Sequence, residues 1–163
     1  MVIDVSKIQS AKNGTFSFTF SFQPSATVVL NTPYQVAGEA EVTGSLTLEA
    51  DAVILKSTMR VPMHYVCDRC GGAFEENLFI ETNEKIVQGE SEDFYTYEGS
   101  SIALIPILEN EIMLHLPTHV LCRPDCKGLC KICGANLNET TCQCAQTQVG
   151  ENNPFAALKG KIK

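Results

Sequence analysis

The chain has 163 residues, of which 44% are apolar and eight are cysteines, and its formal net charge is −7. This length fits one domain with at most a small appendage, and the apolar content is sufficient for an ordinary hydrophobic core. The acidic charge argues against a general RNA-coating protein, because proteins that grip nucleic acid through phosphates usually carry the opposite sign. It favours basic partners, or nucleic-acid contact through a local patch.

The cysteine content also indicates a cellular compartment. The N-terminal stretch MVIDVSKIQS lacks the basic start and apolar run of a signal peptide, and no apolar stretch approaches the length of a membrane span. Eight cysteines without an export signal indicate a reducing compartment, where metal binding is favoured over disulfide formation. We therefore expect a cytoplasmic protein with no membrane partner and no small-molecule substrate.

The first ninety or so residues are typical of β-structure. Phe16, Phe18, Phe20 and Phe22 alternate with hydroxyl residues, which predicts a strand with its rings in the core. Further strands are expected over 36–48, 53–66 and 74–87, in an antiparallel meander, because the connections are too short for helical crossovers. Pro62 predicts that the strand over 53–66 lies at a sheet edge or is broken there.

The second half of the chain predicts an acidic loop over 90–101 and then one helix near 106–116. In IPILENEIMLHLP the leucines and isoleucines recur at helical spacing, Pro106 suits a first turn and Pro117 ends the run. Glu111 and His115 lie one turn apart, and we expect an ordinary surface contact between them. The predicted fold class is α+β, with a β-rich domain over 1–121, a cysteine-rich segment packed on it over 122–145, and a flexible basic tail over 146–163.

The eight cysteines form four short pairs whose spacing indicates metal binding. Zinc takes four soft ligands at tetrahedral corners, and a short C-x-x-C loop supplies two of them. In CDRCGG and in CKICGA a glycine follows the second cysteine, where a flexible backbone lets N–H groups turn toward the thiolates. We therefore predict two Zn²⁺ ions bound by all eight residues: Cys67 and Cys70, Cys122 and Cys126, Cys130 and Cys133, Cys142 and Cys144.

Other uses of paired cysteines fit the sequence less well. A thioredoxin-like C-x-x-C opens a helix, but Gly71 and Gly72 follow the first pair and discourage a helix. Covalent haem attachment needs a histidine after the second cysteine, where this chain has glycine. Catalytic zinc usually leaves an open position and often uses histidine or carboxylate ligands, and the sequence has no HExxH motif. We therefore expect no catalytic residue.

Two groupings of the eight thiols compete. In the favoured one, the last four cysteines share an ion, because they lie within fifteen residues and alternate side chains of an extended C-x-C share a face. The first four cysteines then join the strand region to the segment after the helix through a second ion, so that metal binding is coupled to folding. The other grouping joins both C-x-x-C-G turns in one site, and a single zinc with spare thiols is a third arrangement.

Four stretches of the sequence resemble a known family: CDRCGGAFEENLFIE, LENEIMLHLP, LCRPDCKGLCKICGANLNETTCQC and NPFAALKG. They resemble the YceD-type family of bacterial and plastid proteins, which is named for the accumulation of large-subunit ribosomal RNA. The resemblance runs from about Cys67 to the C-terminus, whereas the residues before it are similar only as a β-rich region. Some relatives lack the last four cysteines, which supports the favoured grouping, and the family supplies no catalytic motif.

The resemblance implies a non-enzymatic, zinc-stabilised factor in the synthesis, processing or stability of large-subunit ribosomal RNA, and hence in ribosome biogenesis. Its partners would be a precursor of that RNA, ribosomal proteins, or both. One alternative is an adaptor or chaperone for a basic ribosomal protein, which the acidic strand region fits electrostatically. Another is a thiol redox switch. The candidate contact residues for RNA or a partner are Arg69, Arg123, Lys127, Lys131, Lys159, Lys161 and Lys163.

Overall fold

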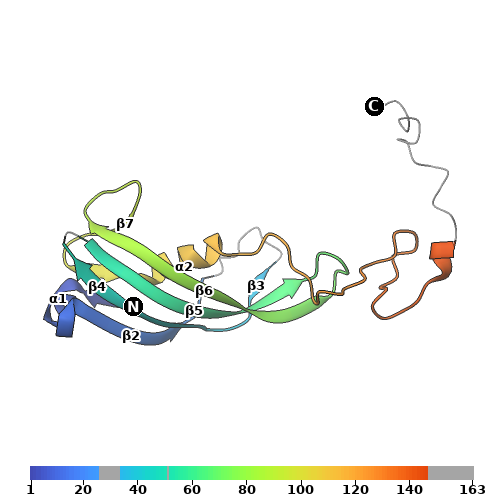
Figure 1. The fold of residues 1–163 in the computed structure, drawn as a ribbon, viewed down its shortest axis with the longest axis horizontal. Coiled ribbons are helices and arrows are strands. Elements are labelled where there is room, and N and C mark those ends of the chain that lie inside the picture. The colour runs from blue at the N-terminus through green and yellow to red at the C-terminus, as the bar shows by residue number, and fades with distance from the viewer. Residues whose placement is uncertain (26–33, 51, 147–163) are drawn as a thin grey trace, which may run out of the picture.

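The computed structural model describes residues 1–25, 34–50 and 52–146, and it consists of a long twisted sheet with helices against one face (Figure 1). The helices are α1 (Val5–Ser10) and α2 (Leu104–Leu114), with 3-10 turns at Lys12–Gly14 and Gln143–Gln146. Neither α-helix of the described residues has the length and apolar character needed to cross a membrane. The strands are β1 (Val2–Asp4), β2 (Thr15–Phe22), β3 (Gln35–Val36), β4 (Ala40–Glu49), β5 (Ala52–Val66), β6 (Ala73–Gln88), β7 (Tyr95–Tyr97) and β8 (Ser101–Ala103).

The main sheet has the strand order β2-β4-β5-β6-β7, and the short β3 also pairs with β5. Strands β2, β4, β5 and β6 are antiparallel to their neighbours, whereas β7 pairs in parallel with the end of β6. Strands β1 and β8 form a separate antiparallel pair. The predicted α+β class and the antiparallel meander of the long strands are therefore confirmed.

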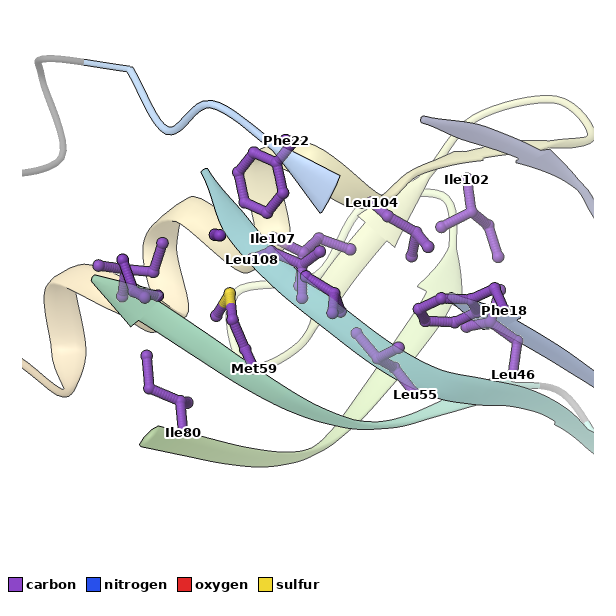
Figure 2. Close-up of a cluster of buried hydrophobic side chains, with 14 of the residues drawn as sticks. Phe18, Phe22, Leu46, Leu55, Met59, Ile80, Ile102, Leu104, Ile107 and Leu108 are labelled. Atoms are coloured by element: carbon purple, nitrogen blue, oxygen red, sulfur yellow. The ribbon is translucent and has the colours of Figure 1, made fainter. Parts of the chain in front are cut away.

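One face of the sheet forms the hydrophobic core with α1 and α2. Phe18 and Phe22 are buried while Ser17, Thr19 and Ser21 of β2 are exposed, as the alternation of the sequence predicts. Figure 2 shows these rings beside aliphatic side chains from β4, β5, β6 and α2. The opposite face is rich in hydroxyl and charged side chains, so the sheet has one dry face and one wet face.

The helices depart from the prediction in position and number. Helix α2 begins and ends two residues before the predicted bounds of 106–116, and His115 follows it as the C-cap. Pro117 keeps the residue before it from continuing the helix. Helix α1 was not predicted, although Asp4 caps it by accepting a hydrogen bond from the Ser6 N–H at 2.8 Å. An aspartate before an apolar i, i+3 pair is the sequence signal that points to this helix.

The prediction for Pro62 was wrong, because β5 is a central strand and continues through it. The Pro62 carbonyl accepts a hydrogen bond from the Ala37 N–H at 2.8 Å, so this part of the Pro62 backbone faces β3 rather than β6. The paired registers of β4 and β3 end on either side of Pro62, at Arg60 and Met63. The missing N–H of the proline falls in the gap between two partner strands and costs no ladder bond.

Two predictions around residues 90–115 were also wrong. The supposed acidic loop contains β7. His115 Nδ1 does lie 3.8 Å from Glu111 Oε2, as expected, but Glu111 is not a surface residue, since only 3% of it is exposed. The Tyr95 hydroxyl donates to Glu111 Oε1 at 2.6 Å, and Asn110 Nδ2 donates to the Tyr95 oxygen at 2.6 Å. Burial and the hydrogen bond to Glu111 raise the pKa of Tyr95 to about 12. A three-residue strand has too weak a local signal to predict, and it is this strand that supplies the partner for the buried carboxylate.

Candidate metal centres

The eight cysteines lie in two separate groups of four. Within each group the four sulfur atoms lie within 4.8 Å of one another. This is the favoured grouping of the sequence analysis, and the two C-x-x-C-G turns belong to different groups. The proximal cysteine group comprises Cys67, Cys70, Cys122 and Cys126, and the distal cysteine group comprises Cys130, Cys133, Cys142 and Cys144.

The proximal cysteine group joins two parts of the chain that are distant in sequence. Cys67 and Cys70 lie in the turn between β5 and β6, whereas Cys122 and Cys126 lie in the segment after α2. Cys67, Cys70 and Cys126 are buried, and Phe74 and Leu121 pack against them. This group therefore closes the end of the β5–β6 hairpin with a small core of its own.

The distal cysteine group lies on a short segment beyond that hairpin. Figure 1 shows this segment, coloured orange, past the end of the sheet, and Leu129 and Asn136 form an isolated antiparallel bridge within it. Cys133 is exposed and the other three are half-buried. Its large apolar side chains Leu129 and Ile132 are 46% and 55% exposed, so four ligands around one ion are its natural source of stability.

The two C-x-x-C-G turns have the same backbone structure. The Gly71 N–H donates to the Cys67 carbonyl at 2.8 Å, and the Gly134 N–H donates to the Cys130 carbonyl at 2.9 Å. Both glycines have positive φ, +69° at Gly71 and +72° at Gly134, in the left-handed region that favours glycine. The glycine that follows each pair in the sequence therefore closes each turn.

These turns also direct backbone N–H groups toward one sulfur in each group. Burial acts to raise the pKa of Cys67, but backbone hydrogen bonds with Cys122, Arg69 and Cys70 outweigh it and lower the pKa to about 6. Backbone hydrogen bonds with Cys133 and Ile132 likewise lower the pKa of Cys130 to about 6. Hydrogen bonds of this kind stabilise thiolates, the form that binds metal.

The sulfur separations suit a tetrahedral ion rather than disulfides. The distances from Cys67 Sγ to Cys126 Sγ and from Cys70 Sγ to Cys122 Sγ are both 3.8 Å. A zinc–sulfur bond of about 2.3 Å implies about 3.8 Å between sulfurs at tetrahedral corners, whereas a disulfide bond is about 2.05 Å long. Four thiolates fill a tetrahedral shell and leave no position for water, which is the arrangement of structural sites.

The two residues between Cys67 and Cys70 attach the second half of the proximal cysteine group. Asp68 Oδ2 accepts from the Val120 N–H at 2.6 Å, and the Asp68 N–H donates to the Val120 carbonyl at 3.0 Å. Arg69 Nη1 donates to the Cys126 carbonyl at 2.8 Å, and the Arg69 carbonyl accepts from the Leu129 N–H at 3.2 Å. Together these bonds bring the segment after α2 against the hairpin turn.

An asparagine of the distal segment completes the surroundings of the proximal cysteine group. Asn138 Nδ2 donates to Cys126 Sγ at 3.3 Å, and Asn138 Oδ1 accepts from the Lys127 N–H at 2.8 Å. The Leu137 N–H also donates to the Gly128 carbonyl at 2.9 Å. The loop between the two halves of the distal group therefore packs on a sulfur of the proximal one. Spacing alone gave no signal for Asn138, because its role depends on contact between two loops.

The basic residues predicted as contacts divide into three sets. Arg123, Lys127 and Lys131 are exposed beside the cysteines, and Arg123 Nε lies 3.6 Å from Asp125 Oδ1. Arg69 is also exposed, but part of its guanidinium is engaged by the Cys126 carbonyl. The tail residues Lys159, Lys161 and Lys163, like most of the predicted flexible tail, lie outside the described residues.

Comparison with known proteins agrees with the resemblance in the sequence. The family model described as "Large ribosomal RNA subunit accumulation protein YceD" matches residues 55–160, which include both cysteine groups. The chain belongs to the YceD family. The family's description names the accumulation of large-subunit ribosomal RNA.

A curated relative is named "Large ribosomal RNA subunit accumulation protein YCED homolog 1, chloroplastic", from Zea mays. It is 42% identical to this YceD-family chain over 57 residues, which is 34% of the chain. The match spans only 18% of the length of that relative. No solved structure matches the chain significantly.

Proposed function

We propose that this YceD-family protein is a non-enzymatic, zinc-stabilised factor in the synthesis, processing or stability of large-subunit ribosomal RNA. The observation that carries the proposal is a family match that spans two groups of four thiols, in each of which the sulfur atoms lie within 4.8 Å of one another. All-thiolate sites without an open position act as folding elements rather than as catalysts. We also propose that the protein works in a reducing compartment such as the cytoplasm, because reducing conditions keep the eight thiols available for metal.

Zinc is the metal that this ligand set fits best. Four cysteine sulfurs with tetrahedral spacing are typical of structural zinc sites, and iron is the main competitor for such ligands. Each group would hold one ion and supply no chemistry beyond fixing the shape of its loop. Elemental analysis of the purified chain should give about two zinc ions per molecule, and one ion or none would contradict the two-site proposal.

The RNA contact surface in this proposal is the cysteine-rich end of the molecule. Arg123, Lys127 and Lys131 are exposed there, and the tail adds Lys159, Lys161 and Lys163. The thiolates reduce the local positive charge, because four thiolates and one Zn²⁺ leave each site at −2. Binding through this surface should therefore be modest in strength and sensitive to salt.

The test is a tagged pull-down from the native host, with and without ribonuclease, that reads RNA and proteins together. If Lys127→Ala and Lys131→Ala together reduce recovery of large-subunit RNA, the basic surface is supported, and Lys7→Ala with Lys56→Ala is the control of equal charge change. Loss of ribosomal proteins on ribonuclease treatment would indicate contact through RNA. Recovery of neither RNA nor ribosomal protein would overturn the proposed function.

The acidic strand region supports a second candidate, an adaptor for a basic ribosomal protein. Strand β6 carries four glutamates and one lysine, and the chain as a whole is acidic. Charge complementarity of this kind promotes association with a basic partner. A basic ribosomal protein that stays bound after ribonuclease treatment would favour the adaptor over direct RNA contact.

A further inference from the structure

Strand β6 presents a long open edge. It pairs with β5 along its length, but on the other side β7 pairs only with residues 86–88. In the described part of the chain, no other backbone pairing reaches residues 75–83 from that side. An edge strand of this length is a ready template for pairing with another chain.

The register shows which backbone groups face this edge. The Pro62 carbonyl accepts from the Ala37 N–H, so Pro62 faces away from β6, and its partner Asn77 then makes no ladder bonds to β5. The Cys67 N–H donates to the Gly72 carbonyl at 2.9 Å, which fixes the same alternation at the turn. The backbone N–H and C=O groups of residues 75, 77, 79, 81 and 83 therefore point outward.

The side chains along this edge indicate the chemistry of a partner. Four glutamates and one lysine give β6 a net charge of −3, and Glu75 and Glu81 flank the open stretch on the wet face. Between them Phe79 is 71% exposed, a large apolar surface among polar neighbours. The acidic flanks disfavour acidic strands and attract basic ones, while the exposed ring offers a cross-strand contact to an apolar residue.

We propose that the open edge of β6 binds an extended basic polypeptide segment, which adds a strand to the sheet with an apolar residue against Phe79 and basic residues against Glu75 and Glu81. Main-chain hydrogen bonds to the outward groups would supply affinity, and the glutamates would select the sign of charge. This inference does not depend on the RNA role, and it gives the adaptor candidate a defined surface.

The experiment uses the full-length, metal-loaded chain and a capped synthetic peptide about as long as the edge, in which lysine alternates with threonine around a central valine. Binding is followed by the fluorescence anisotropy of a dye attached to the peptide. A peptide with glutamate in place of each lysine is the charge control. Residue-resolved amide hydrogen exchange is measured with and without peptide. We expect the amides of 75, 77, 79, 81 and 83 to become protected, whereas the even-numbered amides of β6 are already protected by β5.

The matched variants are Asn77→Pro and Asn77→Thr. Proline at 77 removes one outward N–H and no bond to β5, so the strand is retained while partner pairing is blocked. We expect Asn77→Pro to weaken peptide binding by at least about tenfold, and Asn77→Thr to leave it unchanged. If Asn77→Pro does not fold, the exchange pattern of the unmodified chain still decides the question.

Three results would overturn the inference. Equal binding by the Asn77→Pro and Asn77→Thr variants would reduce the interaction to charge attraction without strand pairing. Unchanged exchange at the outward amides would place the peptide elsewhere. Concentration-dependent protection of those amides without peptide, with dimers in sedimentation velocity, would identify a second copy of the chain as the occupant. None of these results bears on recovery of ribosomal RNA, so the two proposals fail separately.

Discussion

Gly128 lies against the turn that carries Cys67 and Cys70, and its replacement by alanine tests the proposed arrangement of the metal centres. Gly128 has φ of +75° and is buried against the turn between Cys67 and Cys70. An alanine Cβ there would lie 2.7 Å from Arg69 Cγ and 2.8 Å from the Arg69 carbonyl oxygen. Gly134 is the matched control, because its φ is +72° and nothing lies within 4 Å of the corresponding Cβ.

The expected free-energy losses follow from these two differences. A left-handed backbone costs an alanine about 1–2 kcal/mol, and both variants incur this cost. At Gly128 the close contacts add about 1–3 kcal/mol, because the Arg69 carbonyl is held by the Leu129 N–H and cannot move aside freely. Gly128→Ala should therefore lose about 2–5 kcal/mol and Gly134→Ala about 1–2 kcal/mol.

Denaturant unfolding of the zinc-loaded chain measures the loss, and competition with a chromophoric chelator measures zinc affinity. We expect Gly128→Ala to weaken zinc binding at the proximal cysteine group, and Gly134→Ala to affect the distal group. Cadmium-113 spectra of the substituted protein distinguish the two groups. Equal losses in both variants would show that the contact with Arg69 contributes nothing and would refute the reasoning.

Asn138, the two cysteine groups and Tyr95 each offer a further test. Asn138→Ala should speed zinc release from the proximal cysteine group several-fold, because removal of such supporting groups typically lowers metal affinity about 10–100-fold. An unchanged release rate would argue against a supporting role for Asn138. Cys130→Ser should unfold the distal segment alone and Cys67→Ser the whole domain, and equal global unfolding by circular dichroism would contradict two separate sites. The pKa of Tyr95 is raised in the folded state, so the contribution of Tyr95 to the free energy of unfolding should be complete below about pH 10 and lost toward pH 12. Tyr95→Phe should lower the free energy of unfolding by about 1–3 kcal/mol at neutral pH and should flatten its fall between about pH 10 and pH 12. Denaturant unfolding across this pH range measures both effects, and an unchanged pH dependence in the variant would contradict them.

Local patterns were enough to predict the long strands and the four cysteine pairs that the structure gathers into two groups able to hold metal. The alternation of phenylalanine and hydroxyl residues in β2 encodes its buried face, and the one-turn spacing of Leu108 and Ile112 encodes the buried face of α2. The two C-x-x-C-G turns have the same hydrogen bonds because each is built from its own five or six residues. Such features are determined by residues adjacent in sequence, so the sequence by itself contains them.

Other features depend on which segments meet, and only the tertiary structure decided them. Glu111 was predicted at the surface, but the fold buries it against Tyr95, a residue of a strand too short to be recognised. Pro62 is tolerated in a central strand because two partner strands happen to end beside it.

The same holds for the link between the two cysteine groups and for the open edge of β6. Asn138 contacts Cys126 through a loop that folds back on itself, and the edge is open because β7 covers only its last residues. The sequence by itself determined the thiol pairs and the strands, because the spacing of the cysteines and of the alternating apolar residues involves only neighbouring residues. The tertiary structure decided their partners, because contacts between distant segments depend on the packing of the whole chain.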